Sequence, residues 1–255
     1  MSPLPRNHVA ANVTSPSDAE IRLQALNQTK DKLLSIVGHD MRSAIGGVVS
    51  LVDILDRRLE SGDIDEVKRL SGLIRRSARD ADDLLCDLVS WTRSHGQNIH
   101  FRLELLNVIE LIEGEVSRLE VSSSRKQQTI RIEASSPGMI RADRHMLQVI
   151  FRNLLTNALK FSHPGGEVIV RVKHQRGEWV FQVCDQGLGM SPEVQECLLK
   201  VDNRKEQMGT DGETGSGFGL LLCEDFVQRH GGRLDWESAP KQGSMFRFTV
   251  PELIG

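Results

Sequence analysis

The most constraining feature of the sequence is a pair of apolar heptad repeats in its first hundred residues. In the first run, apolar residues recur every seven positions in neighbouring rows, for example at Leu34, Met41, Val48 and Leu55. Ser61-Gly62-Asp63 interrupts the pattern, and a second run of the same kind follows at once. A heptad stripe is typical of a helix that packs in a bundle. The short break therefore predicts an antiparallel helical hairpin over residues 18–95.

Two helices alone leave part of each apolar stripe uncovered, because a bundle helix needs neighbours on more than one side. The simplest solution is a dimeric four-helix bundle, to which each of two copies of the chain contributes a hairpin. A hairpin that lies on the rest of its own chain is the alternative, but it covers less of the stripe. Residues 1–17 include Pro3, Pro5 and Pro16 and are predicted to form a flexible arm.

The pattern changes after the polar stretch SHGQNIH, which ends at residue 100 and predicts a linker. In residues 101–255, helical periodicity alternates with short runs of period two. Helices are predicted at residues 105–125, 143–161 and 218–229, and strands at 129–133, 168–172, 179–183, 233–236 and 245–250. Few strands are joined by helices of crossover length, so a layered α/β sandwich is favoured over a doubly wound sheet. The predicted fold class is α+β.

Composition argues against several functions. The net charge of −3 disfavours a nucleic-acid protein that works by bulk electrostatics. Aromatic residues make up 4% and tyrosine is absent, which disfavours stacking on single strands. No stretch reaches the ~18 consecutive apolar residues that a membrane span needs. The four cysteines form no CxxC pair and sit in apolar segments, which favours a reduced, cytoplasmic location.

His39 stands out in the first heptad run, because the frame puts it on the side away from the apolar stripe. It is expected to face water in the middle of a helix, next to Asp40. A neutral imidazole is a nucleophile, and an ordinary pKa of about 6.5 leaves histidine mostly neutral in the cell. The adjacent carboxylate can take the ring proton or fix its tautomer. A solvated surface histidine is the plain alternative.

A second candidate site lies in the sequence FRNLLTNALKF. Asn153, Asn157 and Lys160 are four and three residues apart, which places them on one face of the predicted helix. The amide oxygen of Asn157 suits a magnesium ion that keeps most of its waters. Lys160 supplies a positive charge for phosphate. An ordinary amphipathic helix with a polar outer face would show the same pattern.

Two glycine-rich motifs complete the set of candidates. Asp185 directly follows a predicted strand and can accept a hydrogen bond from an exocyclic amine, such as that of adenine. The glycines after it permit positive φ and close approach of the backbone. The second motif opens an apolar helix, where backbone amides make a cradle for phosphate. The glycines of the two motifs are Gly187, Gly189, Gly215, Gly217 and Gly219.

Taken in order, these motifs resemble those of two-component sensor histidine kinases, from about residue 30 to the C-terminus. The stretches that carry the resemblance are LLSIVGHDMRSAIGGVVSLVDIL, RHMLQVIFRNLLTNALKFS, DQGLGM and GSGFGL. The resemblance implies that residues 18–95 form the dimerisation and phosphotransfer hairpin, with His39 as phosphoacceptor and Asp40 as the neighbouring base. It also implies that residues 101–255 form a Bergerat-type (GHKL) domain that binds ATP and Mg²⁺.

The family's other roles carry over to the matching positions. Asn157 would bind Mg²⁺ with Asn153 nearby, Lys160 would meet phosphate, Asp185 would read adenine, and the five glycines would shape the nucleotide loops. The implied reaction is ATP-dependent autophosphorylation of His39, followed by transfer to an aspartate of a response-regulator receiver domain. A separate sensor protein is a further candidate partner. Two other functions remain: a degenerate kinase that acts as a phosphotransfer or dimerisation scaffold, and an ATPase or serine kinase with the same nucleotide fold.

Overall fold

The computed structural model describes residues 18–95, 101–135, 138–200, 208–211, 213 and 218–252. The expected arm (residues 1–17) and residues 96–100 of the expected linker lie outside the described residues. Within the described part of the chain, no helix combines the length and the apolar character of a membrane span. The elements in chain order are α1 (Asp18–Ser61), α2 (Ile64–His95), β1 (Glu104–Asn107), α3 (Val108–Arg125), β2 (Thr129–Ala134), β3 (Met139–Ala142), α4 (Arg144–Phe161), β4 (Glu167–Gln175), β5 (Glu178–Asp185), α5 (Pro192–Gln195), α6 (Phe218–Arg229), β6 (Leu234–Ser238) and β7 (Ser244–Pro251).

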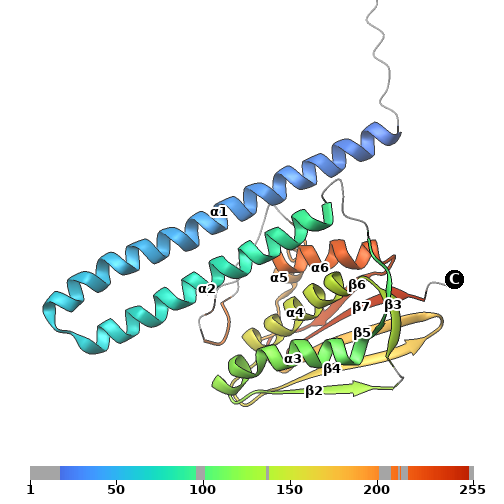
Figure 1. The fold of residues 1–255 in the computed structure, drawn as a ribbon. Coiled ribbons are helices and arrows are strands. Elements are labelled where there is room, and N and C mark those ends of the chain that lie inside the picture. Colours follow the sequence, from blue (N-terminus) through green and yellow to red (C-terminus); the bar gives the residue numbers. More distant parts are fainter. Residues whose placement is uncertain are drawn as a thin grey trace, which may run out of the picture.

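Helices α1 and α2 run antiparallel to each other, and the chain reverses between them at the predicted break (Figure 1). Gly62 adopts a φ of +72° there, in a region that glycine enters at little cost. The hydroxyl of Ser61 donates to the carbonyl of Arg58 (2.9 Å) at the end of α1. The carboxylate of Asp63 accepts from the N–H of Glu66 (3.1 Å) and caps the start of α2. Hydrogen bonds and the glycine conformation at residues 61–66 therefore end α1 and begin α2.

The apolar stripe of α1 is wider than the surface that α2 covers. Met41 and Val48, from the first heptad row, are half-buried. In the neighbouring row, Ile45 and Leu59 are each 51% exposed, and Val52 is 38% exposed. A single copy of the chain thus leaves an apolar strip open on α1. Other large apolar residues of the two helices that are also exposed are Val49, Ile54, Ile64, Leu85 and Val89.

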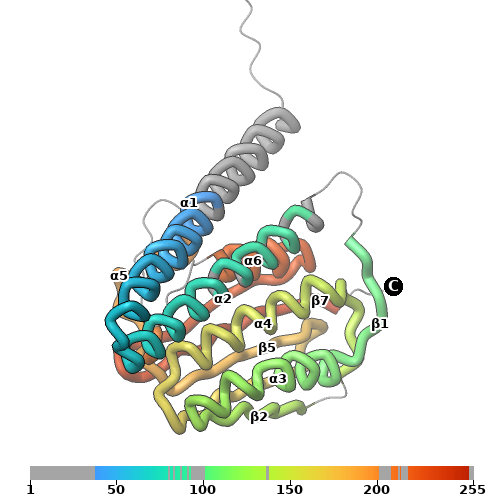
Figure 2. The backbone as a smooth tube through the Cα atoms, turned by 60° about the vertical axis from the view of Figure 1, so that its left-hand side comes forward, coloured from blue at the N-terminus to red at the C-terminus, as the bar shows by residue number. Residues whose placement is uncertain are grey.

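The rest of the chain is a layered α/β structure. Its main sheet has the strand order β2-β4-β5-β7-β6, in which β2 and β4 are parallel and the other pairs are antiparallel. Helices α3, α4 and α6 lie side by side over one face of this sheet (Figures 1 and 2). Strands β1 and β3 form a separate antiparallel pair. The expected layered sandwich is therefore found, with a mixed sheet.

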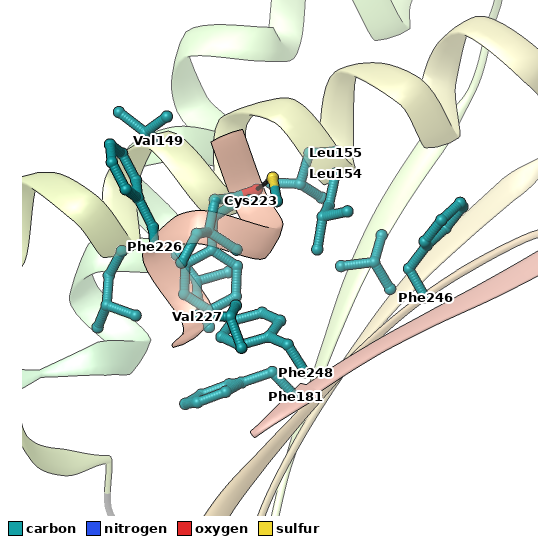
Figure 3. Packing of buried hydrophobic residues seen from close by; sticks show 14 of the residues in the cluster. Val149, Leu154, Leu155, Phe181, Cys223, Phe226, Val227, Phe246 and Phe248 are labelled. Carbon is teal, nitrogen blue, oxygen red and sulfur yellow. Dashed lines mark hydrogen bonds between the residues drawn. The ribbon is translucent and has the colours of Figure 1, made fainter. Parts of the chain in front are cut away.

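One hydrophobic core joins the helices to the sheet. Alternate residues of β4 and β5 face it, which follows from the period-two pattern that predicted both strands. Figure 3 shows side chains of α4 and α6 meeting aromatic side chains of the sheet. Phe151 packs edge-on against Phe181 and Phe248, with ring centroids 5.4 and 5.3 Å apart. Residues of this core that Figure 3 labels include Leu154, Leu155, Cys223, Phe226 and Val227.

The structure differs from the sequence prediction at β1 and β3. The predicted helix from residue 105 begins only at Val108, and the four residues before it form β1. The side chain of Asn107 accepts from the N–H of Ile109 (3.2 Å) and donates to Glu110 (2.8 Å), which fixes the helix start. Strand β3 was not predicted at all. Each strand has four residues, too few to show a clear period.

The helical hairpin lies on the second domain, because both α1 and α2 contact α6. Leu84 of α2 is buried in the core, and Met41 and Leu88 pack against that core. A guanidinium N–H of Arg76 also donates to the carbonyl of Asp211 (2.6 Å). The hairpin thus lies on the rest of its own chain, which was the alternative to the dimeric bundle. The apolar strip on α1 is still exposed in this arrangement.

Candidate active site

His39 lies on α1 with its imidazole in solvent. Its side chain is 80% exposed, as the heptad frame predicted, and that of Asp40 is 27% exposed. The Nδ1 atom of His39 is 3.2 Å from Oδ1 of Asp40. If Nδ1 carries the proton and donates it to this carboxylate, the lone pair is on Nε2. The geometry therefore presents an oriented, accessible nitrogen nucleophile.

Helix α4 carries the three polar residues predicted to share a face. Its start is fixed by Asp143, whose carboxylate accepts from the N–H of Met146 (3.1 Å). Asn153, Asn157 and Lys160 are all half-buried, between leucines and alanine that are buried in the core. Among the described residues, no hydrogen-bond acceptor reaches the buried Nδ2 of Asn153. A buried amide nitrogen without an acceptor is costly, and a phosphate oxygen of a bound ligand is one group that can supply the acceptor.

Asp185 lies at the end of β5 and is 8% exposed. Burial raises the pKa of its carboxyl to about 6, although hydrogen bonds from Gly187 and Ser244 act in the opposite direction. One of those bonds joins the N–H of Gly187 to Oδ1 of Asp185 (3.0 Å). A buried carboxylate held in this way can accept a hydrogen bond from a ligand, and a raised pKa of this kind is typical of functional sites.

The glycines that follow Asp185 allow this loop to touch the end of α4. A Cβ on Gly187 would lie 2.0 Å from the carbonyl oxygen of Phe161. The N–H of Leu188 donates to that same carbonyl (3.0 Å). Gly189 has a φ of +60°, and a Cβ there would lie 1.8 Å from the carbonyl oxygen of Ala239. Both glycines are therefore required by close packing of the chain.

The second glycine motif also reaches α4. Gly219, at the start of α6, lies against Asn153, since a Cβ on the glycine would be 2.5 Å from Oδ1 of the asparagine. Gly209 lies against Lys160, where a Cβ would be 2.7 Å from Cγ of the lysine. Gly215 and Gly217 lie outside the described residues. Gly219 of this motif and Gly209, which precedes it in the chain, are thus placed at opposite ends of the polar face of α4.

The structure brings together most of the predicted candidates. The polar face of α4 meets the loop after β5, Gly209 and Gly219 in one region. His39 and Asp40 lie apart from it on α1. Sequence reasoning missed Lys126, a buried residue that contacts the last turn of α4 and the segment around Thr210. It lies in the polar stretch RKQQT, and no pattern there distinguishes it from a solvated lysine.

The donor atoms fit ATP and a magnesium ion. Asp185 can accept from an amine, and Asn153 and Lys160 can donate to phosphate oxygens. Within the described residues, no group of three or more His, Cys, Asp or Glu side chains could hold a metal ion. Mg²⁺ usually keeps several waters and takes one or two protein oxygens together with substrate phosphates. The amide oxygen of Asn157 suits that role.

Comparison with known proteins defines the class. Residues 142–254 match the histidine kinase-, DNA gyrase B- and HSP90-like ATPase family. This match covers α4, both glycine motifs and the strands between and after them. Residues 142–254 are therefore similar to this ATPase family, and the resemblance of the chain to sensor histidine kinases is confirmed by its relatives.

The relatives are curated sensor kinases. Over 92% of its length the chain is 27% identical to sensor protein KdpD of Clostridium acetobutylicum, of which it spans 26%. Over 87% of its length it is 30% identical to the adaptive-response sensory kinase SasA of a Synechococcus species, of which it spans 57%. The chain therefore corresponds to only a part of each of these relatives.

A solved structure has the same arrangement of elements. The crystal structure of histidine kinase ThkA in complex with response regulator protein TrrA matches 92% of this chain with a TM-score of 0.66. The match covers 64% of that chain at 17% sequence identity, so it shows a shared fold.

Proposed function

We propose that the protein is an ATP-dependent protein-histidine kinase that phosphorylates itself on His39 and passes the phosphoryl group to an aspartate of a response regulator. The observation that carries the proposal is the pairing of two separate sites in one chain. One is the polar face of α4, which lies beside the loop that follows Asp185 and against Gly219. The other is His39, exposed on α1 and hydrogen-bonded to Asp40.

In the nucleotide site, Asp185 accepts a hydrogen bond from the exocyclic amine of adenine. Lys160 meets the phosphates together with Nδ2 of Asn153, which has no acceptor among the described residues. Asn157 holds the magnesium ion, which when bound supplies charge neutralisation on the phosphate oxygens. These groups lie on rigid elements, so their main contribution is to position the terminal phosphate.

In the transfer step, Nε2 of His39 attacks the γ-phosphorus, an N–P bond forms, and the bond to the β-γ bridging oxygen breaks. ADP leaves with the electron pair of that bond. Positive charge develops on the imidazole as the new bond forms, and Asp40, 3.2 Å from Nδ1, offsets it or takes the Nδ1 proton. Phosphohistidine is then the donor to the aspartate of the regulator.

The proposal includes a homodimer formed through the hairpin. The exposed apolar row of α1, which contains Ile45, Val52 and Leu59, is the surface that a second copy would cover. The response regulator, a separate sensor protein and the cytoplasmic location expected from the sequence belong to the same proposal. Fold similarity to a kinase in complex with its response regulator supports the choice of partner.

The test is incubation of the chain with γ-labelled ATP and magnesium. Label that is stable to base and released by acid is expected, as phosphohistidine requires. His39→Gln should abolish the label and leave ATP affinity unchanged. His174→Gln is the matched control, because His174 is also exposed and paired with a carboxylate, at 3.0 Å from Glu252. Label that persists in His39→Gln, or acid-stable label, would refute the phosphoacceptor assignment.

A further inference from the structure

Lys126 has a buried ammonium group that the proposed reaction does not use. It is the C-cap residue of α3, and its side chain is 8% exposed. Burial of an unpaired ammonium is very costly, so a lysine in this position needs specific partners. Its Nζ lies 2.6 Å from Oε1 of Glu213, 2.8 Å from Oγ1 of Thr210, and 3.1 and 3.3 Å from the carbonyl oxygens of Lys160 and Leu159.

Two of these partners belong to a short segment, called here the docked turn, that consists of Gly209, Thr210, Asp211 and Glu213. The segment is closed on itself through Glu213. The second carboxylate oxygen of Glu213 accepts from the N–H of Asp211 (2.8 Å), and its main-chain carbonyl accepts from the N–H of Gly209 (2.8 Å). Glu213 therefore ties the docked turn together and to Lys126 at once.

The docked turn rests directly on Lys160. The N–H and the hydroxyl of Thr210 lie 3.1 and 3.2 Å from the carbonyl oxygen of Lys160. Gly209 packs against the side-chain stem of the lysine, since a Cβ on Gly209 would be 2.7 Å from its Cγ. Because the main chain and the stem of Lys160 are both held, the positions open to its ammonium are restricted.

We propose that the ion pair of Lys126 and Glu213 positions Lys160. By holding the docked turn against α4, the pair restricts where the ammonium group of Lys160 can meet a phosphate. This inference rests on the proposed function, in which Lys160 meets the phosphates of ATP. Neither Lys126 nor Glu213 needs to touch the nucleotide. Their ion pair fixes the docked turn on the last turn of α4, and the docked turn fixes Lys160.

The competing role is purely structural. Lys126 also satisfies two carbonyls at the end of α4, which a cationic side chain at a helix C-terminus commonly does. If that were its whole role, loss of the pair with Glu213 would lower stability without changing which part of the nucleotide binds. A positioning role predicts a selective loss of affinity for the phosphates. Binding of adenosine, which carries no phosphate, distinguishes the structural role from the positioning role.

The experiment measures ATP and adenosine binding to the full chain and to Glu213→Gln, Lys126→Met and the double variant, together with thermal unfolding without nucleotide. Glu178→Gln is the matched control. Glu178 is 23% exposed against 25% for Glu213 and pairs with Arg233 at 3.0 Å, on a strand end outside the candidate site. Glu213→Gln removes the charge and keeps the size of the side chain, so it is the variant least able to disturb folding.

We expect Glu213→Gln to weaken ATP binding by about tenfold or more, the range of a lost charge-assisted hydrogen bond, and to leave adenosine binding unchanged. The double variant should lose no more than the larger of the two single losses, because the residues act as a unit. Equal losses for ATP and adenosine, unchanged ATP affinity, or a fall in unfolding temperature alone would overturn the positioning role.

The same measurements separate this proposal from the kinase proposal. If the unmodified chain binds ATP but is not phosphorylated, the kinase proposal fails, and the positioning role is still decided by the binding data. If the unmodified chain binds no ATP, both proposals are refuted.

Discussion

The buried carboxyl of Asp185 is expected to make nucleotide affinity depend on pH in a range that is easy to reach. Burial raises its pKa to about 6. The carboxylate is a stronger acceptor for the adenine amine than the neutral acid, because a charged partner roughly doubles the strength of a hydrogen bond. ATP should therefore bind more weakly as the pH falls through 6.

The size of the effect follows from the fraction of Asp185 that is ionised. With a pKa of about 6, the carboxyl is about nine-tenths ionised at pH 7 and about one-tenth ionised at pH 5. If only the ionised form accepts the amine, affinity falls about tenfold over this interval, or about 1.4 kcal/mol. Asp185→Asn has no charge to lose, and its own affinity should be lower by about 1–3 kcal/mol at pH 7 because its amide group is mispaired.

The assay is calorimetric titration of ATP at pH 5, 6 and 7 in the His39→Gln background, which prevents consumption of ATP. The phosphates of ATP also titrate in this range, but they do so for both proteins. The informative quantity is therefore the ratio of affinities with aspartate and with asparagine at position 185. This ratio should shrink about tenfold from pH 7 to pH 5. A ratio that stays constant would show that Asp185 does not read the adenine amine through its charge.

Three further outcomes follow from the structure. Asp40→Asn should slow phosphorylation of the acceptor histidine by roughly 10²–10⁴-fold in single-turnover kinetics, with ATP affinity unchanged. Val49→Asp should convert a dimer into a monomer by light scattering without unfolding the chain, because Val49 is 56% exposed in one copy. Gly219→Ala should weaken ATP binding, since the new Cβ would lie 2.5 Å from Oδ1 of Asn153. Gly114→Ala is its control, with nothing within 4 Å, and should stabilise α3 by up to about 1 kcal/mol.

Much of the fold could be predicted because long elements carry a strong period. The helix 143–161 was predicted to within one residue, since its leucines recur at helical spacing and Asp143 caps its start. In strands β4 and β5 the core-facing residues alternate over the predicted stretches 168–172 and 179–183. In contrast, Leu105 and Leu106 precede an apolar helix directly and extend its pattern. The signal that could have separated them is Asn107 with Glu110 three residues later, a pairing typical of a helix start.

The candidate site was predictable where it depends on spacing along one helix and not where it depends on contacts between distant segments. Asn153, Asn157 and Lys160 follow from positions in a single helix. The bonds of Lys126 reach residues 34 and 84 positions away, and a sequence pattern contains no such information. The exposure of His39 was also predictable, since the heptad frame assigns a side of the helix to every residue.

The bond from Arg76 to the carbonyl of Asp211 joins the hairpin to the docked turn beside the proposed nucleotide site. Asp211 belongs to the docked turn, and its own N–H is bonded to Glu213. Thermodynamic coupling between two sites is reciprocal. A ligand that favours this position of the turn strengthens the packing of α2 on α6 by the same amount by which that packing strengthens the ligand. If the turn keeps this position when nucleotide is bound, a change that separates the hairpin from α6 would weaken nucleotide binding.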